Sequence, residues 1–179
     1  MNLSKRRIPF QPSSLSVVKC MVELASPQPG DKIIDLGAGD GRIPIYFALK
    51  YDDIHCYGIE ISSDLVDLAQ KRVGKLDLSN RVKILKGDLF KVNLSKFDII
   101  TMYLTPYAIK RLLPSLITAL STGSKIISHD FKIPGLSPVK QIVVDSRHKL
   151  YLYSSDSIPR NFDNLENSSS LLLKYSRSL

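Results

Sequence analysis

The sequence predicts an α/β fold in which helices cover both faces of a doubly wound, mostly parallel sheet. Short apolar stretches alternate with segments of helical periodicity along most of the 179 residues. A glycine-rich turn at residues 37–41 directly follows the first predicted strand. No helical pattern separates the last two apolar stretches, which indicates that the sheet ends in an antiparallel hairpin.

Three predicted strands and three predicted helices fill the first half of the chain. Ser13 and Ser14 are suited to cap the first helix, and Pro27, Pro29 and Gly30 end it. The predicted strands are residues 32–36, 55–61 and 81–86, and the predicted helices are residues 15–25, 42–51 and 62–76.

The second half contains one more helix and four predicted strands. Thr105 followed by Pro106 is typical of an N-cap with proline in the first turn, and Pro114 is expected to kink or divide the helix that follows. Residues 1–154 are expected to form one domain, and residues 155–179 a polar extension of unassigned role. The predicted strands are residues 97–103, 125–129, 140–144 and 150–153, and the helix covers residues 105–120.

The helix predicted over residues 62–76 also allows a prediction of its buried face. Apolar side chains recur there at intervals of three and four residues, as on one side of an α-helix. The face expected to pack on the sheet consists of Leu65, Leu68, Ala69, Val73 and Leu76.

Composition excludes several classes of protein. Hydrophobic residues make up 44% of the chain, enough for a sizeable core. No apolar run approaches the length of a membrane span, and the basic N-terminus lacks the apolar region of a signal peptide. Cys20 and Cys56 match no metal or redox spacing, so we expect two reduced thiols and a cytoplasmic protein.

The charge balance leaves two interpretations open. Lysine and arginine number 25 against 17 acidic residues, a formal net charge of +8. Such a balance attracts nucleic acid or acidic proteins. Lysines scattered over the surface for solubility explain it equally well, because only Lys5, Arg6 and Arg7 form a tight cluster.

The turn DLGAGDGR indicates which ligand the sheet binds. Its glycines stand at positions 37, 39 and 41, whereas a dinucleotide-binding G-x-G-x-x-G would need its third glycine at Arg42. Asp35 stands two residues before the first glycine, where a carboxylate is a poor neighbour for a pyrophosphate. It is a good neighbour for the ammonium group of a methionine moiety.

Two further acids stand at the ends of the next two strands. Glu60 is placed to accept both ribose hydroxyls, and Asp88 to accept the adenine amino group. Each acid alone is more typical of a solvated loop than of a binding site. Together with Asp35 and the glycine spacing, they predict a site for S-adenosylmethionine at one edge of the sheet.

These motifs resemble those of the class I, Rossmann-like methyltransferases. Within that class the chain resembles the archaeal seven-strand protein-lysine methyltransferases and their mitochondrial relatives, which methylate ATP synthase and the adenine nucleotide translocase. The resemblance covers about residues 8–154. Its motifs are IPFQPSS, DLGAGDGRI, YGIEIS, KGDLF, TMYLTP, SHDFKIPGLSP and LYLY.

The resemblance implies a set of cofactor-binding residues. In that family an aromatic-x-Pro-Thr/Ser element near the N-terminus covers the methionine end of the cofactor, which would place Phe10 and Ser13 there. A hydrophobic staple and a helix cap are equally physical roles for these two residues. The full implied set is Phe10, Ser13, Asp35, Gly37, Ala38, Gly39, Gly41, Glu60, Ile61, Asp88 and Leu89.

The acceptor site is expected at the end of the fourth strand, with Tyr103 lining the point where amine and methyl group meet. Thr105 and Tyr107 are weaker candidates. His129 and Asp130 could accept the proton or orient the target, and a capping or salt-bridged pair is an equal alternative. No metal is expected, because no partner spacing supports His129 as a ligand.

Four functions remain in order of preference. The first is methylation of lysine side chains in proteins with exposed lysines, without a membrane partner. Nucleobase methylation ranks second, because LTPY has Leu104 where adenine amino-methyltransferases have Asn or Asp. A small-molecule methyltransferase ranks third and a non-catalytic cofactor-binding module fourth. The oligomeric state is not indicated by the sequence.

Overall fold

The computed structural model describes residues 11–159 of the chain. Phe10 and the basic cluster before it lie outside the described residues, as does the C-terminal extension from residue 160 onward. The predicted role of Phe10 is therefore not tested by the fold.

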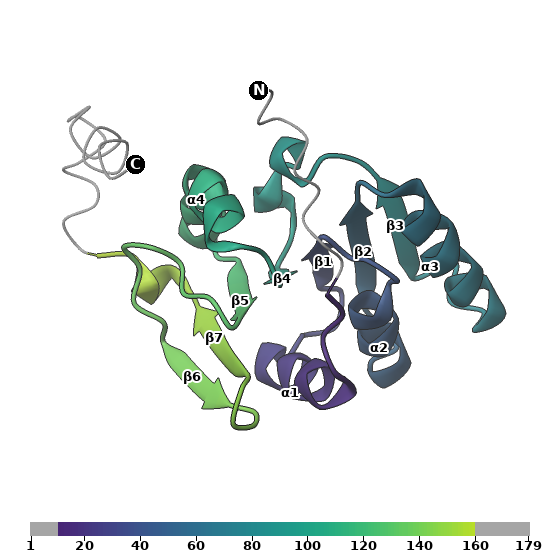
Figure 1. Ribbon diagram of the computed structural model, residues 1–179, viewed down its shortest axis with the longest axis horizontal. Coiled ribbons are helices and arrows are strands. Elements are labelled where there is room, and N and C mark those ends of the chain that lie inside the picture. Colours follow the sequence, from purple (N-terminus) through teal and green to yellow (C-terminus); the bar gives the residue numbers. More distant parts are fainter. Residues whose placement is uncertain (1–10, 160–179) are drawn as a thin grey trace.

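One seven-stranded sheet forms the centre of the molecule (Figure 1). The strand order is β3-β2-β1-β4-β5-β7-β6, in which the first five strands are parallel and β7 runs antiparallel to both β5 and β6. This arrangement confirms the predicted α/β fold with its C-terminal hairpin. The strands are β1 (Lys32–Leu36), β2 (His55–Glu60), β3 (Val82–Lys86), β4 (Ile99–Met102), β5 (Lys125–His129), β6 (Lys140–Val143) and β7 (Lys149–Tyr153).

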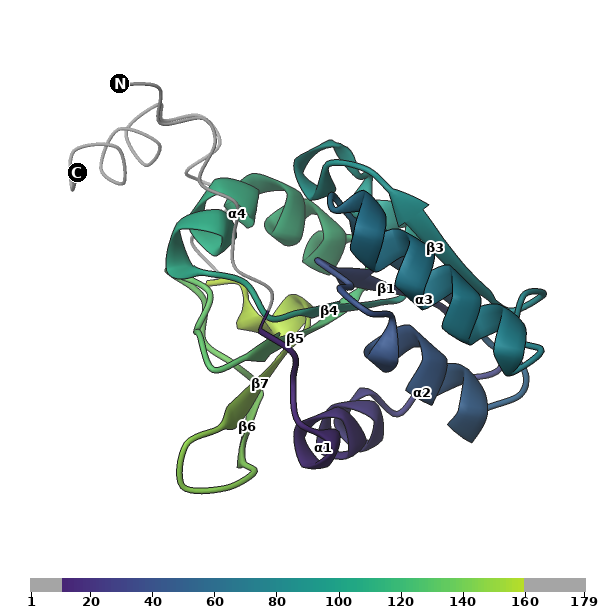
Figure 2. The same ribbon diagram turned by 45° about the vertical axis from the view of Figure 1, so that its right-hand side comes forward.

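Four α-helices of the described part of the chain cover the two faces of the sheet. Figures 1 and 2 show α1, α2 and α3 on one face and α4 on the other. Within residues 11–159, two short 3₁₀ turns connect β3 to β4, η2 (Leu89–Lys91) and η3 (Leu94–Lys96), and a third, η4 (Ser155–Ser157), follows β7. The helices are α1 (Leu15–Ala25), α2 (Arg42–Lys50), α3 (Ser63–Lys75) and α4 (Pro106–Ser121).

The two-residue period of the strands divides the apolar core into two clusters. Ile33 and Ile99 pack with the helices α1, α2 and α3. Their chain neighbours Ile34 and Ile100 point to the opposite face and pack with α4. Successive side chains of a strand alternate between faces, so an unbroken apolar run supplies both sides of a buried parallel sheet.

The predicted buried face of α3 is wrong in part. Ala69 and Val73 are buried as expected, but the third buried residue is Val66, and Leu68 and Leu76 are 41% and 46% exposed. The reason is close packing, because a Cβ built on Gly41 would lie 2.9 Å from the Cβ of Ala69. Only a small side chain fits at position 69 this close to the glycine turn.

Pro114 does not divide α4. The helix runs without interruption from Pro106 to Ser121, and the Thr105 side chain caps it by accepting the N–H of Ala108, as predicted. Pro114 lies on the exposed side of the helix. Proline has no N–H, so one backbone hydrogen bond of the helix cannot form. Because this position faces away from the core, the helix tolerates the loss.

Both cysteines are free, as the sequence predicts. Cys56 is buried in β2, where burial raises the pKa of its thiol to about 12, and Cys20 is half-buried on α1. Within residues 11–159, no helix is both long and apolar enough to cross a membrane.

Gly58 in β2 allows the glycine turn to pack directly on the sheet. A Cβ at this position would lie 2.6 Å from the Cβ of Ala38 and 2.8 Å from Cδ1 of Ile84. Both contacts are shorter than packed carbon atoms allow. The absence of a side chain at Gly58 therefore sets how closely the turn after β1 approaches β2.

We expect Gly58→Ala to lower the free energy of unfolding by about 1–3 kcal/mol through overpacking. Gly74→Ala is the matched control, because a Cβ at this helical glycine of α3 meets nothing within 4 Å. Gly74→Ala should raise the free energy of unfolding by roughly 0.5–1 kcal/mol, because alanine favours the helix more than glycine does. Urea denaturation of both variants measures the difference, and equal effects would contradict the packing argument.

Candidate active site

Three predicted acids stand at one edge of the sheet. Asp35 lies in β1, Glu60 ends β2 and Asp88 follows β3, and these strands are adjacent and parallel. The strand order reverses between β1 and β4, which both lie next to the turn after β1. Ligands of doubly wound sheets bind at such a point.

The glycine turn has a backbone that residues with side chains rarely adopt. The φ angles of Gly37, Gly39 and Gly41 are 77°, 53° and 78°. The N–H groups of Gly37 and Ala38 both donate to the carbonyl of Ile59, at 3.0 Å each. The turn is therefore tied to the end of β2, and its glycines allow a ligand to approach the backbone without a Cβ clash.

Glu60 holds the same turn through its side chain. Its Oε2 accepts the N–H of Gly39 at 3.0 Å, and its Oε1 accepts those of Ile61 and Ser62 at 2.8 and 2.9 Å. Oε1 is thus filled, whereas Oε2 has room for one more donor. A ribose hydroxyl would reach Glu60 through Oε2, and the 68% exposed side chain of Ile61 flanks this position.

Asp35 is buried beside the turn. Its Oδ1 accepts the hydroxyl of Thr101 at 2.8 Å. Burial raises the pKa of this carboxyl to about 7, and the negative charges of Glu60 and Asp40 add to the rise. An ionised Asp35 therefore lacks a full counter-charge, which a ligand ammonium group would supply.

Asp88 closes the third position of the predicted cofactor site. Its Oδ1 accepts the N–H of Phe90 at 3.0 Å and caps η2. Asp88 and Leu89 are both half-buried, so they remain accessible to a ligand at the end of β3. The structure thus brings Asp35, Glu60 and Asp88, with the glycine turn between them, to one edge of the sheet.

A cluster of charges behind the turn was missed by sequence reasoning. Asp40 is buried and forms ion pairs with Arg42 and Arg72. These arginines hold the pKa of Asp40 below its usual range against the opposing effect of burial. Arg42 also donates to the backbone carbonyl of Ser13 at 2.8 Å, which ties the N-terminal segment to the turn. The adjacent acidic and basic residues Asp40 and Arg42 in the glycine motif were the feature of the sequence that could have indicated this ion pair.

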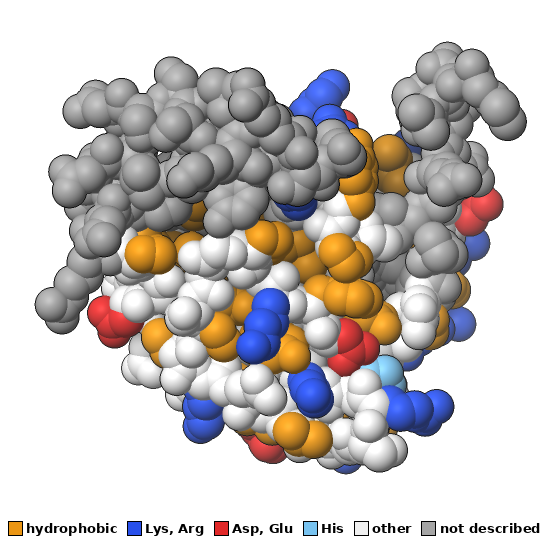
Figure 3. Space-filling model, turned by 60° about the vertical axis from the view of Figure 1, so that its left-hand side comes forward, with side chains coloured by type: hydrophobic (Ala, Val, Ile, Leu, Met, Phe, Trp, Pro, Cys, Tyr) orange, Lys and Arg blue, Asp and Glu red, His pale blue; other side chains and the backbone are white. Residues whose placement is uncertain are grey.

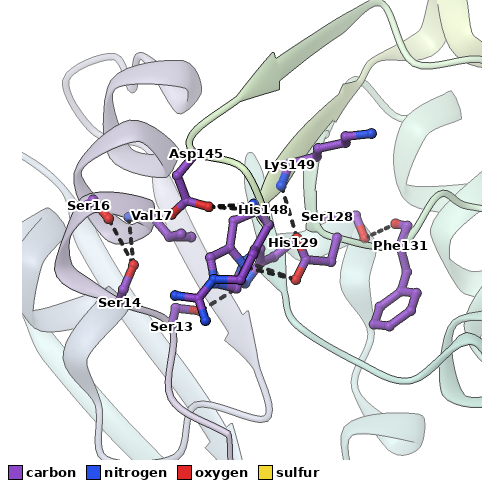
Figure 4. A network of polar contacts seen from close by, with 12 residues as sticks. Ser13, Ser14, Ser16, Val17, Ser128, His129, Phe131, Asp145, His148 and Lys149 are labelled. Atoms are coloured by element: carbon purple, nitrogen blue, oxygen red, sulfur yellow. Dashed lines mark hydrogen bonds and ion pairs between the residues drawn. The ribbon is translucent and has the colours of Figure 1, made fainter.

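The two serines before α1 have different roles. Ser14 caps the helix by accepting the N–H of Val17 at 3.4 Å. Ser13 is buried, and its Oγ lies 3.1 Å from Nδ1 of His129 at the end of β5 (Figure 4). The N-terminal segment therefore joins the predicted acceptor site rather than only starting a helix.

Tyr103 follows β4 and lies against two aromatic rings. Its ring centroid is 3.9 Å from that of His129 and 6.4 Å from that of Phe131. Burial and the nearby Asp130 carboxylate raise the pKa of its hydroxyl, so it keeps its proton at neutral pH. Thr105 serves as the cap of α4, and Tyr107 is 72% exposed.

His129 and Asp130 gain a partner that the sequence did not indicate. His148, directly before the last strand, contacts both of them. Figure 4 shows His148 beside His129. Burial lowers the pKa of His129 to about 4, so its ring is neutral at physiological pH. The expected salt bridge between His129 and Asp130 is therefore not an ion pair. Asp130 adopts a φ of 61° and accepts the N–H of Lys149 at 2.9 Å.

We expect Arg42→Gln to lower the free energy of unfolding by about 1–3 kcal/mol, because it leaves the buried Asp40 with one cation and frees the Ser13 carbonyl. Lys50→Gln, on the same helix as Arg42, is the control, since it breaks an exposed ion pair with Glu23 of α1. That change should cost less than about 1 kcal/mol. Urea denaturation compares the two, and a larger loss in Lys50→Gln would contradict the assignment.

The raised pKa of Asp35 predicts a pH dependence of stability. The folded chain holds this proton more tightly than the unfolded chain, so the stabilisation is complete below about pH 4 and is lost as the pH rises through about 7. The effect approaches about 4 kcal/mol across that window. Unfolding free energies from pH 5 to 8 should fall more steeply for wild type than for Asp35→Asn. The exposed Asp67→Asn should follow wild type, and parallel curves for all three would refute the prediction.

Comparison with known proteins identifies the family. The family model that describes the ANTKMT methyltransferase domain matches residues 35–140 of this chain. A protein-lysine N-methyltransferase from Saccharolobus islandicus is 34% identical over 149 residues, which cover 82% of this chain and 92% of the relative. An adenine nucleotide translocase lysine N-methyltransferase from Mus musculus is 29% identical over 147 residues, and the matched region spans 63% of its length.

A solved structure agrees in fold over nearly its whole length. It is an RNA methyltransferase from Salinibacter ruber in complex with S-adenosyl-L-homocysteine, with 34% identity and a TM-score of 0.77. The match covers 84% of this chain and 97% of that one. The glycine cradle, the buried carboxyl of Asp35 and the open acceptor position on Glu60 fit the corresponding methyl donor. The chain therefore belongs to the ANTKMT methyltransferase domain family and is an S-adenosylmethionine-dependent methyltransferase.

Proposed function

We propose that this enzyme methylates lysine side chains of proteins. The curated relatives from Saccharolobus islandicus and Mus musculus carry that activity in their names, which supports the proposal. The observation that carries it is the surroundings of Tyr103, where stacked rings stand at the end of β4 without a side-chain amide that would grip a base.

The cofactor would be held by the edge described above. Glu60 would accept a ribose hydroxyl through Oε2, Asp88 would accept the adenine amino group, and Asp35 would face the ammonium group. When bound, S-adenosylmethionine supplies the methyl group to the acceptor nitrogen.

The acceptor side must present lysine as a neutral amine. The unperturbed pKa of a lysine is about 10.4, and an apolar, aromatic environment lowers it by disfavouring the charged form. The rings of Tyr103 and Phe131, with the buried ring of His129 behind Tyr103, supply such surroundings, and the two accessible rings can contact the alkyl chain of the substrate. Positioning and exclusion of water then provide most of the rate enhancement.

RNA methylation is the second candidate, because the Salinibacter ruber structure bears that description. Two observations weigh against it. The side chain at the base-gripping position, Leu104, is buried in the core beside α4 and lies 3.3 Å from a Cβ built on Gly37. Lys and Arg side chains are also dispersed over the face in Figure 3 rather than gathered in one stripe.

The test is methyl transfer from labelled S-adenosylmethionine into an extract of the cells that encode this chain. Samples are divided between protease and nuclease treatment, and the label is then identified by mass spectrometry. We expect protease-sensitive label on ε-N-methyllysine, and its loss in Asp35→Ala. Nuclease-sensitive label would refute the lysine proposal and favour RNA.

The role of Tyr103 is tested with the same assay and a matched tyrosine. Tyr103→Leu removes the ring and should lower kcat/KM at least roughly tenfold, since misplacement of the acceptor is costly. Tyr103→Phe keeps the stack and should lose less. Tyr57→Phe is the control, because Tyr57 is also half-buried and pairs with Phe97 at a centroid distance of 5.4 Å. Full activity of Tyr103→Leu would remove this residue from the acceptor site.

A further inference from the structure

Three side chains meet where the last parallel strand approaches the C-terminal hairpin. His129 ends β5 and His148 precedes β7, which pairs with β5 (Figure 4). Asp130 directly follows His129 in the chain. The three side chains are buried or half-buried. Together they form a group that can offer two imidazole nitrogens and one carboxylate oxygen to a single ion.

The three ligand atoms form a nearly equilateral triangle. Nε2 of His129 lies 3.2 Å from Nδ1 of His148 and 3.4 Å from Oδ2 of Asp130. Nδ1 of His148 lies 3.0 Å from the same carboxylate oxygen. Each of the three atoms therefore approaches both of the others closely.

Hydrogen bonds satisfy at most two sides of this triangle. Asp130 Oδ2 accepts from both nitrogens only if both carry a proton, and the two N–H groups then face each other across 3.2 Å. If one nitrogen lacks its proton, one of its two contacts has no donor. Protons alone thus leave one short contact unexplained.

A metal ion satisfies all three sides at once. Zinc binds imidazole nitrogen and carboxylate oxygen at about 2.0–2.1 Å in a tetrahedral arrangement, which separates ligand atoms by about 3.3 Å. The observed separations are 3.0, 3.2 and 3.4 Å. We propose that His129, Asp130 and His148 bind a divalent transition-metal ion of the zinc class and leave its fourth position open.

The contacts around the triangle orient the three ligands. Nδ1 of His129 lies 3.1 Å from Ser13 Oγ, the kind of outer hydrogen bond that fixes the tautomer of a metal-binding histidine. The second oxygen of Asp130 accepts the N–H of Lys149 at 2.9 Å. Asp145 accepts the N–H of His148 at 3.0 Å and so fixes the hairpin turn that carries it.

The position of the ion gives it a consequence for the enzyme. Its ligands come from β5 and from the hairpin, and Ser13 belongs to the N-terminal segment. The ring of Tyr103 packs against that of His129, so a bound ion would fix the ring that supports the acceptor site. The metal proposal does not depend on which acceptor the enzyme methylates.

The test uses the full chain, freed of metal with a chelator and then titrated with zinc in the absence of cofactor. Isothermal titration and elemental analysis after gel filtration should give one zinc per chain. His148→Ala and Asp130→Asn should each weaken binding by at least roughly tenfold. His55→Ala should bind as wild type does, because His55 is the remaining histidine and lies at the exposed start of β2.

Thermal unfolding provides a second readout without any methyl transfer. Zinc at about 100 times its Kd should stabilise wild type by roughly 2.7 kcal/mol and leave His148→Ala unchanged. Circular dichroism verifies that both variants are folded. The proposal fails if wild type binds no zinc at micromolar concentration. It also fails if His148→Ala retains wild-type affinity, or if Cys20→Ser rather than His148→Ala abolishes binding.

Discussion

The attachment of the glycine turn to the end of β2 is the constraint on which the cofactor edge depends. Two backbone N–H groups of the turn donate to Ile59, and the Glu60 carboxylate accepts a third from Gly39. Gly58 lets the turn pack on the strand, and the positive φ angles of its glycines let the chain reverse there. The acid that would bind ribose therefore also fixes the backbone beside it.

The same turn is connected to the acceptor side through charge. Asp40 forms an ion pair with Arg42, and Arg42 donates a hydrogen bond to the backbone carbonyl of Ser13. The side chain of Ser13 contacts His129. His129 in turn supports the ring of Tyr103. This continuous series of contacts joins the cofactor edge to the end of β5. It explains how an N-terminal segment remote in sequence takes part in both halves of the site.

Leu104 shows how the fold limits the chemistry available to this enzyme. Its side chain packs in the core beside α4 and fills the space next to Gly37. A polar side chain there would either lose its hydrogen bonds by burial or displace the glycine turn. The position cannot grip a nucleobase without disturbing the cradle, which favours an acceptor recognised by aromatic surroundings.

The sequence by itself determined the sheet, the hairpin and the acids at the carboxyl ends of the strands. These features follow from local periodicity and from the rule that parallel strands end at one edge. The buried face of α3 was mispredicted in part, because the side of the helix that faces the core depends on how closely Ala69 approaches Gly41. The spacing of apolar residues along the sequence carries no information on this distance. The partnership of His129 with His148 was likewise decided by the antiparallel pairing of β5 with β7, which brings together residues 19 positions apart. Local patterns fix which elements form, whereas contacts between distant side chains depend on the register and packing that only the tertiary structure provides.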